Sequence, residues 1–188
     1  MRNFSHPLMD NNITNADISS LISFLKKNKK KIFTQSKKVL EFEKKWSKWL
    51  GTKYSIFVNS GSSANLLTLQ ALKILHGEGE VILPPLTWVS DIAAVIQNGF
   101  KPVFADINPK TLCMDENEII KKINKNTKAV FVTHVQGFNG LTKTLLKTLS
   151  QKKIILLEDV CESHGALFNK KKLGSFGLMS NFSFYYAH

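Results

Sequence analysis

The spacing of apolar residues changes once along the chain, near residue 52. Before that point, apolar residues recur at helical spacing over 17–27 and again over 39–50, which predicts two amphipathic helices. Thr14 and Asp17 have the spacing of a helix-capping pair, and Gly51 fits the stop of the second helix. Residues 1–51 are therefore predicted to form an N-terminal helical segment.

From residue 52 onward, short apolar runs alternate with helical patterns. We expect strands at 54–59, 81–83, 101–106, 129–133, 154–158 and 181–185, and helices at 62–75, 90–97, 116–123 and 142–149. This alternation is typical of right-handed β-α-β units and of a mostly parallel sheet with helices on both faces. The unbroken apolar run from Ile154 to Leu157 fits a strand buried on both faces. Residues 52–188 are thus predicted to be one three-layer α/β domain.

The composition is that of a globular protein with an excess of positive charge. The 188 residues are 43% apolar, enough for a core of single-domain size, and the formal net charge is +12. Two lysine-rich runs, at 26–31 and 170–172, lie next to turn signals and lack the interleaved aromatic residues of a nucleic-acid platform. We interpret them as solvated surface and expect no nucleic-acid partner. A module that binds polyanions is the alternative that this charge leaves open.

Cysteine usage and hydropathy favour a cytoplasmic protein. The spacing of the two cysteines, Cys113 and Cys161, matches no metal-binding motif, so a reducing compartment is the default and no metal is expected. Residues 1–10 lack the apolar core of a signal peptide, and no stretch has the roughly 18 apolar residues that a membrane span requires. The sequence stops at His188 without a terminating signal, so we expect it to be the N-terminal part of a longer protein.

Two segments at predicted strand ends have the chemistry of a binding site. The run from Asn59 to Asn65 joins a strand to a helix and places small hydroxyl residues at a helix N-terminus, a site suited to a phosphate. Either Ser62 or Ser63 could instead be only an N-cap. Trp88 follows the next strand, where an indole can lie over a planar ring, although an isolated tryptophan is more often part of a core.

The most informative residue is an acid at the end of the buried strand. A carboxylate in the position of Asp159 costs several kcal/mol unless a cation or hydrogen-bond donors compensate it, and a protonated pyridine nitrogen is such a cation. The alternative is that Asp159 caps the following turn. Together with Ser183 and His188 at the end of the chain, these groups match the inventory of a pyridoxal phosphate site.

The same segments resemble a known family in collinear order over nearly the whole chain. They are FVNSGSSANL at 57–66, VILP at 81–84, PVFAD at 102–106, LED at 157–159, GSFG at 174–177 and FSFY at 182–185. They resemble the DegT/DnrJ/EryC1/StrS family of fold-type I, pyridoxal phosphate-dependent enzymes acting on nucleotide-linked keto sugars. The resemblance implies roles for six residues around the cofactor. Ser62, Ser63 and Ser183 would hold the phosphate, Trp88 would stack on the ring, Asp159 would pair with the ring nitrogen, and Glu162 would lie near the ring hydroxyl.

The chain departs from the aminotransferases of that family at its last residue. Their Schiff-base lysine lies five residues after the serine of the FSF segment, and that register falls on His188. An imidazole cannot form the covalent link, but it can accept and return a proton. The replacement resembles the sugar 3-dehydratase branch, in which His188 would be the base for removal of the C3 hydroxyl from a 4-keto-6-deoxy sugar. A lysine just beyond residue 188 would instead make the protein an aminotransferase.

The resemblance also implies partners. We expect pyridoxal 5'-phosphate or pyridoxamine 5'-phosphate as cofactor, glutamate as amino donor, a nucleotide-sugar substrate from surface polysaccharide or lipopolysaccharide biosynthesis, and a homodimer when the chain is complete. The chain by itself is expected to be inactive, since the small domain and part of the large domain would be missing. His134 and His164 also follow predicted strands, and we interpret them as structural or site-lining.

Overall fold

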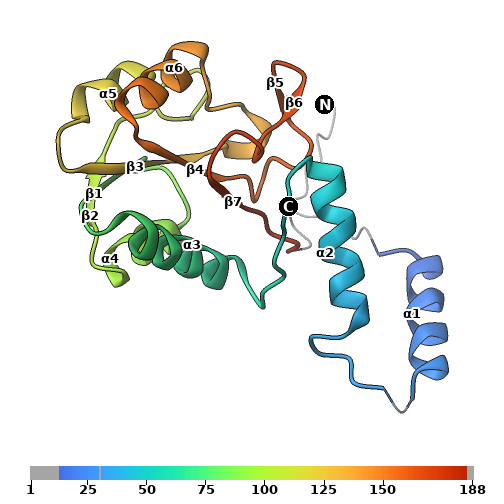
Figure 1. The fold of residues 1–188 in the computed structure, drawn as a ribbon. Coiled ribbons are helices and arrows are strands. Elements are labelled where there is room, and N and C mark those ends of the chain that lie inside the picture. Colours follow the sequence, from blue (N-terminus) through green and yellow to red (C-terminus); the bar gives the residue numbers. More distant parts are fainter. Residues whose placement is uncertain (1–12, 30, 186–188) are drawn as a thin grey trace, which may run out of the picture.

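The computed structural model describes residues 13–29 and 31–185. Its main feature is a parallel sheet with the strand order β2-β1-β3-β4-β7 (Figure 1). The strands are β2 (Lys101–Phe104), β1 (Glu80–Leu83), β3 (Thr127–Thr133), β4 (Ile155–Asp159) and β7 (Met179–Asn181). All neighbouring pairs run parallel, as the β-α-β pattern predicts, so the carboxyl ends of all five strands meet at one edge.

Helices cover both faces of the sheet. Figure 1 shows α3 (Gly61–His76) and α4 (Val89–Gln97) on one face and α5 (Glu116–Lys122) and α6 (Lys143–Lys152) on the other. Alternate residues of β3 explain how two cores form: Phe131 packs with the α3–α4 layer, whereas its neighbours Val130 and Val132 pack with the α5–α6 layer. The predicted three-layer α/β architecture is therefore confirmed.

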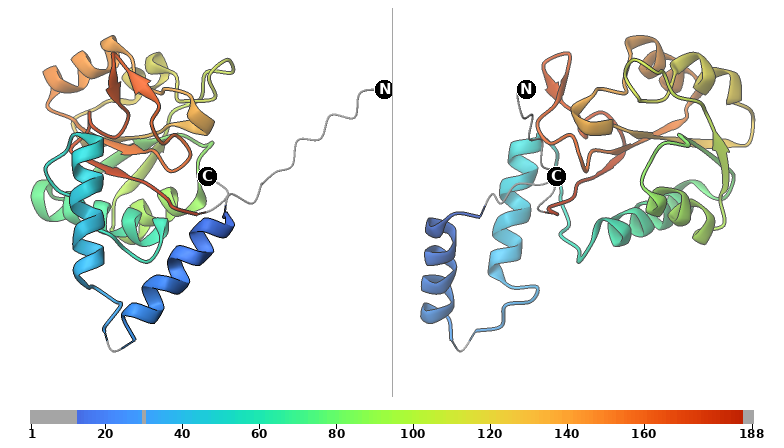
Figure 2. Two further views of the ribbon diagram at one scale, coloured as in Figure 1. Left: turned by 90° about the vertical axis from the view of Figure 1, so that its right-hand side faces the viewer. Right: turned by 180° about the vertical axis from the view of Figure 1, so that it is seen from behind.

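The N-terminal helices lie to one side of these layers (Figures 1 and 2). They are α1 (Asn15–Lys27), which begins with the predicted capping box of Thr14 and Asp17, and α2 (Lys37–Leu50), which ends at Gly51 with a φ of 86°. Trp46 of α2 packs edge-on against Phe182, with ring centroids 5.1 Å apart, and so connects α2 to the segment after β7. The domain boundary at residue 51 stays a prediction.

Two predicted strands are wrong. Residues 54–59 pair with no strand of the described chain and contact α2 instead: the Ser55 hydroxyl lies 2.8 Å from that of Ser47, and Phe57 N–H donates to Glu43. The strand expected at 181–185 instead ends at Asn181. Its ladder with β4 stops there, because β4 itself ends at Asp159 and the chain then turns.

The sequence pattern also missed a short hairpin, β5 (Leu167–Phe168) paired with β6 (Lys171–Lys172). The two turn residues, Asn169 and Lys170, both have positive φ angles. Such turns usually contain glycine, and its absence here explains why the sequence did not indicate a hairpin. Lys172 in this hairpin lies over the Trp49 ring, 4.9 Å from its centroid. In the part of the chain that is described, no helix has both the length and the apolar character needed to cross a membrane.

Candidate active site

The candidate site lies where β3 and β4 end. Asp159 is the last residue of β4, is 3% exposed, and lies directly beside Thr133 of β3 in the strand register. One carboxylate oxygen of Asp159 accepts a hydrogen bond from Cys161 N–H at 2.8 Å, so Asp159 does hold the following turn. This turn-capping bond uses one oxygen only, and it leaves open a second role for the carboxylate.

The N-terminus of α3 adjoins the same turn. A Cβ atom placed on Gly61 would lie 4.0 Å from Cys161 Sγ, so the first residue of α3 packs against the loop that follows Asp159. The N-cap is Ser60, whose hydroxyl accepts from Ser63 N–H at 3.1 Å, and the first turn contains no acidic residue. The cap formed by Ser60 does not use Ser62, which is exposed in the first turn. The other N–H groups at the start of a helix have no partner within the helix. This is a place where an anion is stabilised.

The indole of Trp88 is at the start of α4 and is not part of a core. Trp88 is the N-cap residue of α4 and is 70% exposed. An aromatic ring left open to solvent beside buried polar groups is available to stack on a planar ligand. Of the two interpretations that the sequence allowed for Trp88, the core position is wrong.

A chain of buried amide and hydroxyl groups connects these segments. Asn65 of α3 donates to Asp91 of α4 at 2.5 Å and accepts from Asn181 of β7 at 2.6 Å. Asn181 in turn accepts from Thr68 of α3 at 2.8 Å. These hydrogen bonds therefore fix the start of α3, the start of α4 and the end of β7 relative to one another.

Sequence reasoning missed Asp91, Asn65 and Asn181. Asp91 lies in the first turn of a helix, where acids are common, so an aspartate there does not by itself indicate a site residue. Only its position three residues after Trp88 could have pointed to the site. Asp91 is 1% exposed, and burial together with the neighbouring charge of Asp159 raises its pKa to about 8, although hydrogen bonds from Thr87 and Thr133 act in the opposite direction.

Glu158 belongs to a separate structural cluster. Its carboxylate accepts N–H groups from Gly174, Phe176 and Gly177 at 2.7 to 2.9 Å, and the His134 ring lies 3.1 Å away. Burial opposes ionisation, but these hydrogen bonds and His134 hold the pKa of Glu158 below its usual value. The other ring nitrogen of His134 accepts Gly140 N–H at 3.0 Å, so Nε2 carries the proton and donates to Glu158. His134 is thus structural.

The remaining predicted residues lie around the strand ends. Glu162 is exposed in the loop after β4, and the His164 ring stacks on Phe182 with centroids 5.5 Å apart. The hydroxyl of Ser183, half-buried just after β7, accepts from Tyr185 N–H at 3.2 Å. His188, the predicted base, lies outside the described residues.

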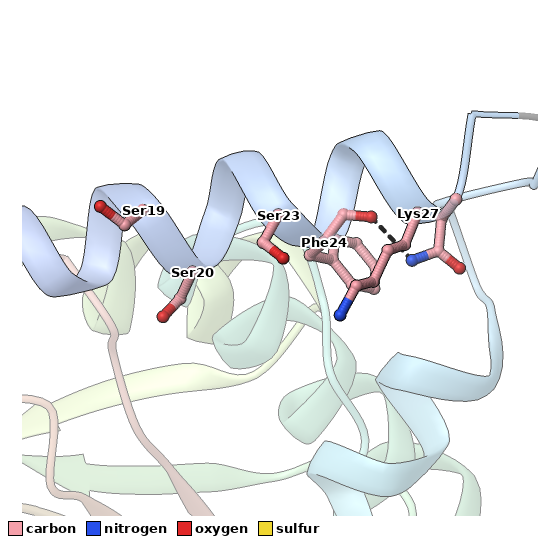
Figure 3. A pocket seen from close by; sticks show the side chains of 6 residues that line it. Ser19, Ser20, Ser23, Phe24 and Lys27 are labelled. Carbon is pink, nitrogen blue, oxygen red and sulfur yellow. Dashed lines mark hydrogen bonds between the residues drawn. The ribbon is translucent and has the colours of Figure 1, made fainter.

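A concavity elsewhere on the surface is not part of this site. It lies along α1, is lined by Ser19, Ser20, Ser23, Phe24, Lys27 and Asn28, and has a volume of about 520 Å³ (Figure 3). The dashed bond in Figure 3 joins the Asn28 amide to the Phe24 carbonyl at 2.7 Å, which is part of the end of the helix. The concavity has no acidic residue and is wide open to solvent, whereas the acids at the strand ends are buried.

The residues at the strand ends fit a pyridoxal phosphate group. A buried pair of acids needs a cation or a proton, a helix start without an acid suits a phosphate, and an exposed indole suits an aromatic ring. A three-layer α/β fold with these groups at the carboxyl ends of parallel strands defines the class of fold-type I, pyridoxal phosphate-binding proteins.

Comparison with known proteins identifies the family within that class. The sequence profile of the DegT/DnrJ/EryC1/StrS aminotransferase family matches residues 13–188, and the chain belongs to this family. Among curated relatives, GDP-4-keto-6-deoxy-D-mannose 3-dehydratase of Escherichia coli O55:H7 is 37% identical over 164 residues, which are 84% of this chain and 42% of the relative. GDP-perosamine synthase of Vibrio cholerae is 34% identical over 154 residues, 82% of this chain and 42% of the relative.

Solved structures show the same similarity. E. coli GDP-4-keto-6-deoxy-D-mannose-3-dehydratase with bound hydrated PLP superposes with a TM-score of 0.90 at 33% identity, covering 98% of this chain and 48% of that one. GDP-4-keto-6-deoxymannose-3-dehydratase with a trapped PLP-glutamate geminal diamine gives a TM-score of 0.89, again at 33% identity, covering 97% and 48%. The chain therefore spans less than half the length of each of these four proteins.

Proposed function

We propose that the complete protein containing this chain is a pyridoxamine phosphate-dependent 3-dehydratase acting on a nucleotide-linked 4-keto-6-deoxy sugar. The observation that carries the proposal is the position of Asp159, buried at the end of β4 where α3, α4 and the end of β7 converge. The similarity to a 3-dehydratase over 84% of this chain supports the same activity.

Each residue has a proposed role around the cofactor. The α3 N-terminus with Ser62 and Ser63, joined by Ser183, binds the phosphate; Trp88 covers one face of the ring; and Asp159 holds a proton on the ring nitrogen. Glu162 would lie near the ring hydroxyl. When bound, the cofactor supplies an electron sink for the carbon attached to its ring.

His188 is the proposed base. In the register of the family its imidazole replaces the lysine that an aminotransferase needs, and it would take a proton from the carbon beside the ring while the C3 hydroxyl of the sugar leaves. Over a complete cycle the sugar would lose its C3 hydroxyl and be reduced by two electrons, which glutamate would supply as it regenerates the amino form of the cofactor. The products would be a 3-deoxy-4-keto sugar, 2-oxoglutarate and ammonia. We further propose a cytoplasmic homodimer.

A sugar aminotransferase is the second candidate. The 34% identity to GDP-perosamine synthase favours it, because that relative covers nearly as much of this chain as the dehydratase does. The two candidates differ in the fate of the amino group. A dehydratase releases ammonia, whereas an aminotransferase leaves the nitrogen on the sugar.

The test is to express the complete reading frame and incubate it with pyridoxal phosphate, glutamate and a GDP-linked 4-keto-6-deoxy sugar. We expect ammonia release and a 3-deoxy product by mass spectrometry. We also expect His188→Asn to lower kcat by about 100-fold or more while cofactor absorbance is retained. An amino-sugar product without ammonia would contradict the dehydratase.

Cofactor binding is tested separately with two aspartates at the carboxyl ends of strands in the same sheet. We expect Asp159→Asn to abolish or strongly weaken pyridoxamine phosphate binding. Asp106→Asn is the matched control, because Asp106 follows the edge strand β2 and is exposed. Equal loss of binding in both variants would mean that Asp159 has no specific role.

A further inference from the structure

A second buried carboxyl group, that of Asp91, lies beside Asp159 and has no part in the proposed function so far. Asp91 is 1% exposed and Asp159 is 3% exposed. Thr133 connects their positions: its hydroxyl lies 3.4 Å from Asp91 Oδ2, and its backbone is paired in register with that of Asp159. The two acids therefore share one buried space at the ends of β3 and β4.

The surroundings of Asp91 fix its orientation. Its Oδ1 accepts from the Asn65 amide at 2.5 Å, and the Asn65 oxygen is occupied by Asn181, so the Asn65 side chain cannot turn over without breaking both bonds. Its Oδ2 contacts the Thr87 hydroxyl, which lies 2.7 Å from that of Thr133. Asp91 is thus held by groups from α3, from the loop before α4 and from β3.

The charged and titratable groups that face Asp91 are acidic or neutral. Asp159 faces it from β4, Cys161 from the loop after β4, and no cation of the described residues is among the groups that act on its carboxyl. Two ionised carboxylates in one buried space repel each other strongly. Burial and Asp159 raise the pKa of Asp91 to about 8, and burial together with both acids also raises the pKa of the Cys161 thiol.

We propose that Asp91 is a positioning residue that keeps its proton at neutral pH and donates it in a hydrogen bond to the Asp159 carboxylate. Asp159 then has one donor from Cys161 N–H and a second from Asp91. The pair bears one negative charge, which matches the single positive charge of a protonated ring nitrogen. The match with a ring nitrogen rests on the proposed function, whereas the protonation of Asp91 does not.

The first test needs no cofactor. The complete reading frame is produced with ¹³C-labelled aspartate, and the carboxyl signals are followed by NMR as pH is changed. We expect the Asp91 signal, assigned through its bonds to the backbone, to titrate between about pH 7 and pH 9 and to be missing from Asp91→Asn. An Asp91 signal that titrates below about pH 5, as an ordinary aspartate does, would overturn the proposal.

The second test uses pyridoxamine phosphate as the probe and its dissociation constant as the readout. We expect an inflection near pH 8 in the wild type that Asp91→Asn lacks, with equal affinity at pH 7, because an amide can donate to Asp159 and accept from Asn65. Asp91→Leu removes the donor and should bind at least about ten-fold more weakly, the effect of one lost hydrogen bond of about 1.4 kcal/mol.

The controls separate the possible failures. Asp106→Asn should keep the inflection, since Asp106 is exposed and its carboxylate accepts from the neighbouring Ile107 N–H. An inflection that persists in Asp91→Asn overturns the role of Asp91. Absence of any pyridoxamine phosphate binding overturns the proposed function instead. The NMR titration uses the wild type, so it decides the protonation of Asp91 even when a variant does not fold.

Discussion

Two buried acids, Glu158 and Asp91, are stabilised in opposite protonation states. Glu158 accepts three backbone N–H groups and the Nε2–H of His134, so its charged form is favoured and its pKa is lowered. Burial and the neighbouring charge of Asp159 favour the neutral form of Asp91 and raise its pKa to about 8. The residue type alone predicts neither outcome, because burial opposes charge on both acids and the difference comes from their neighbouring charges and hydrogen-bond partners.

Replacing Glu158 tests the structural cluster. We expect Glu158→Gln to lower the free energy of unfolding by about 3 kcal/mol, because an amide leaves buried N–H groups unpaired and places its own NH₂ against them. Urea unfolding of the purified chain measures the change. Glu118→Gln is the control, since Glu118 pairs with Lys121 at the surface of α5 and its loss should not be measurable. A similar effect in both variants would mean that the Glu158 cluster contributes little.

The pH dependence of stability tests Asp91. A folded-state pKa raised from 3.8 to about 8 means that the stabilisation is complete below the lower value and is lost as pH rises toward the higher one. Asp91→Asn removes this loss, so its melting temperature relative to wild type should rise between about pH 4 and pH 8. A constant difference across that range would contradict the raised pKa.

At the scale of elements, two serines at the start of α3 have different roles: one caps the helix and the other lies in the proposed anion site. Ser60 caps the helix, whereas Ser62 lies exposed in the first turn. The sequence suggested that Ser62 or Ser63 could be the cap, and the structure gives that role to Ser60. The cap and the proposed anion site are therefore adjacent but distinct.

Paired substitutions distinguish the two serines. We expect Ser60→Ala to lower the free energy of unfolding by about 1 kcal/mol through loss of the cap. Ser62→Ala should change stability by less than about 0.5 kcal/mol but weaken pyridoxamine phosphate binding about ten-fold. Urea unfolding and a binding titration measure the two effects. If Ser62→Ala binds as the wild type does, the phosphate does not use that hydroxyl.

The sequence predicted most elements because their signals are local. The capping box of α1, Gly51 after α2 and the buried run of β4 all act within a few residues. The failures depend on distant partners: residues 54–59 have strand character but lie along α2, and β7 ends where β4 has no further residue to pair with. In the site, Asp159 was predictable from its strand, whereas Asp91 and Asn65 became visible only through contacts between helices.

At the scale of the whole molecule, the described residues leave α1 with an open apolar side. In α1 no residue is buried, and Ile18, Leu21, Ile22 and Leu25 are 44–57% exposed. Figures 1 and 2 show α1 beyond α2, away from the sheet. The chain covers 42% of its dehydratase relative, so the surface of this polypeptide need not be the surface of the complete protein.

Association of the isolated polypeptide tests this surface. We expect the 188-residue polypeptide to self-associate as its concentration rises, because exposed apolar side chains on one helix face favour burial. Sedimentation velocity should show less association for Leu21→Lys combined with Leu25→Lys. Ser20→Lys on the same helix is the control and should behave as the wild type does. Unchanged association in the double variant would place the contact elsewhere.

The hydrogen bonds of Asn181 have a consequence for synthesis on the ribosome. Asn181 is bonded to Thr68 and Asn65, which precede it by 113 and 116 residues. A nascent chain can form α3 and α4 early, but their polar ends have no β7 partner until residue 181 has left the exit tunnel. The pocket that we propose for the cofactor therefore stays incomplete during translation until residue 181 has emerged, and any earlier release yields a polypeptide with an unfinished pocket.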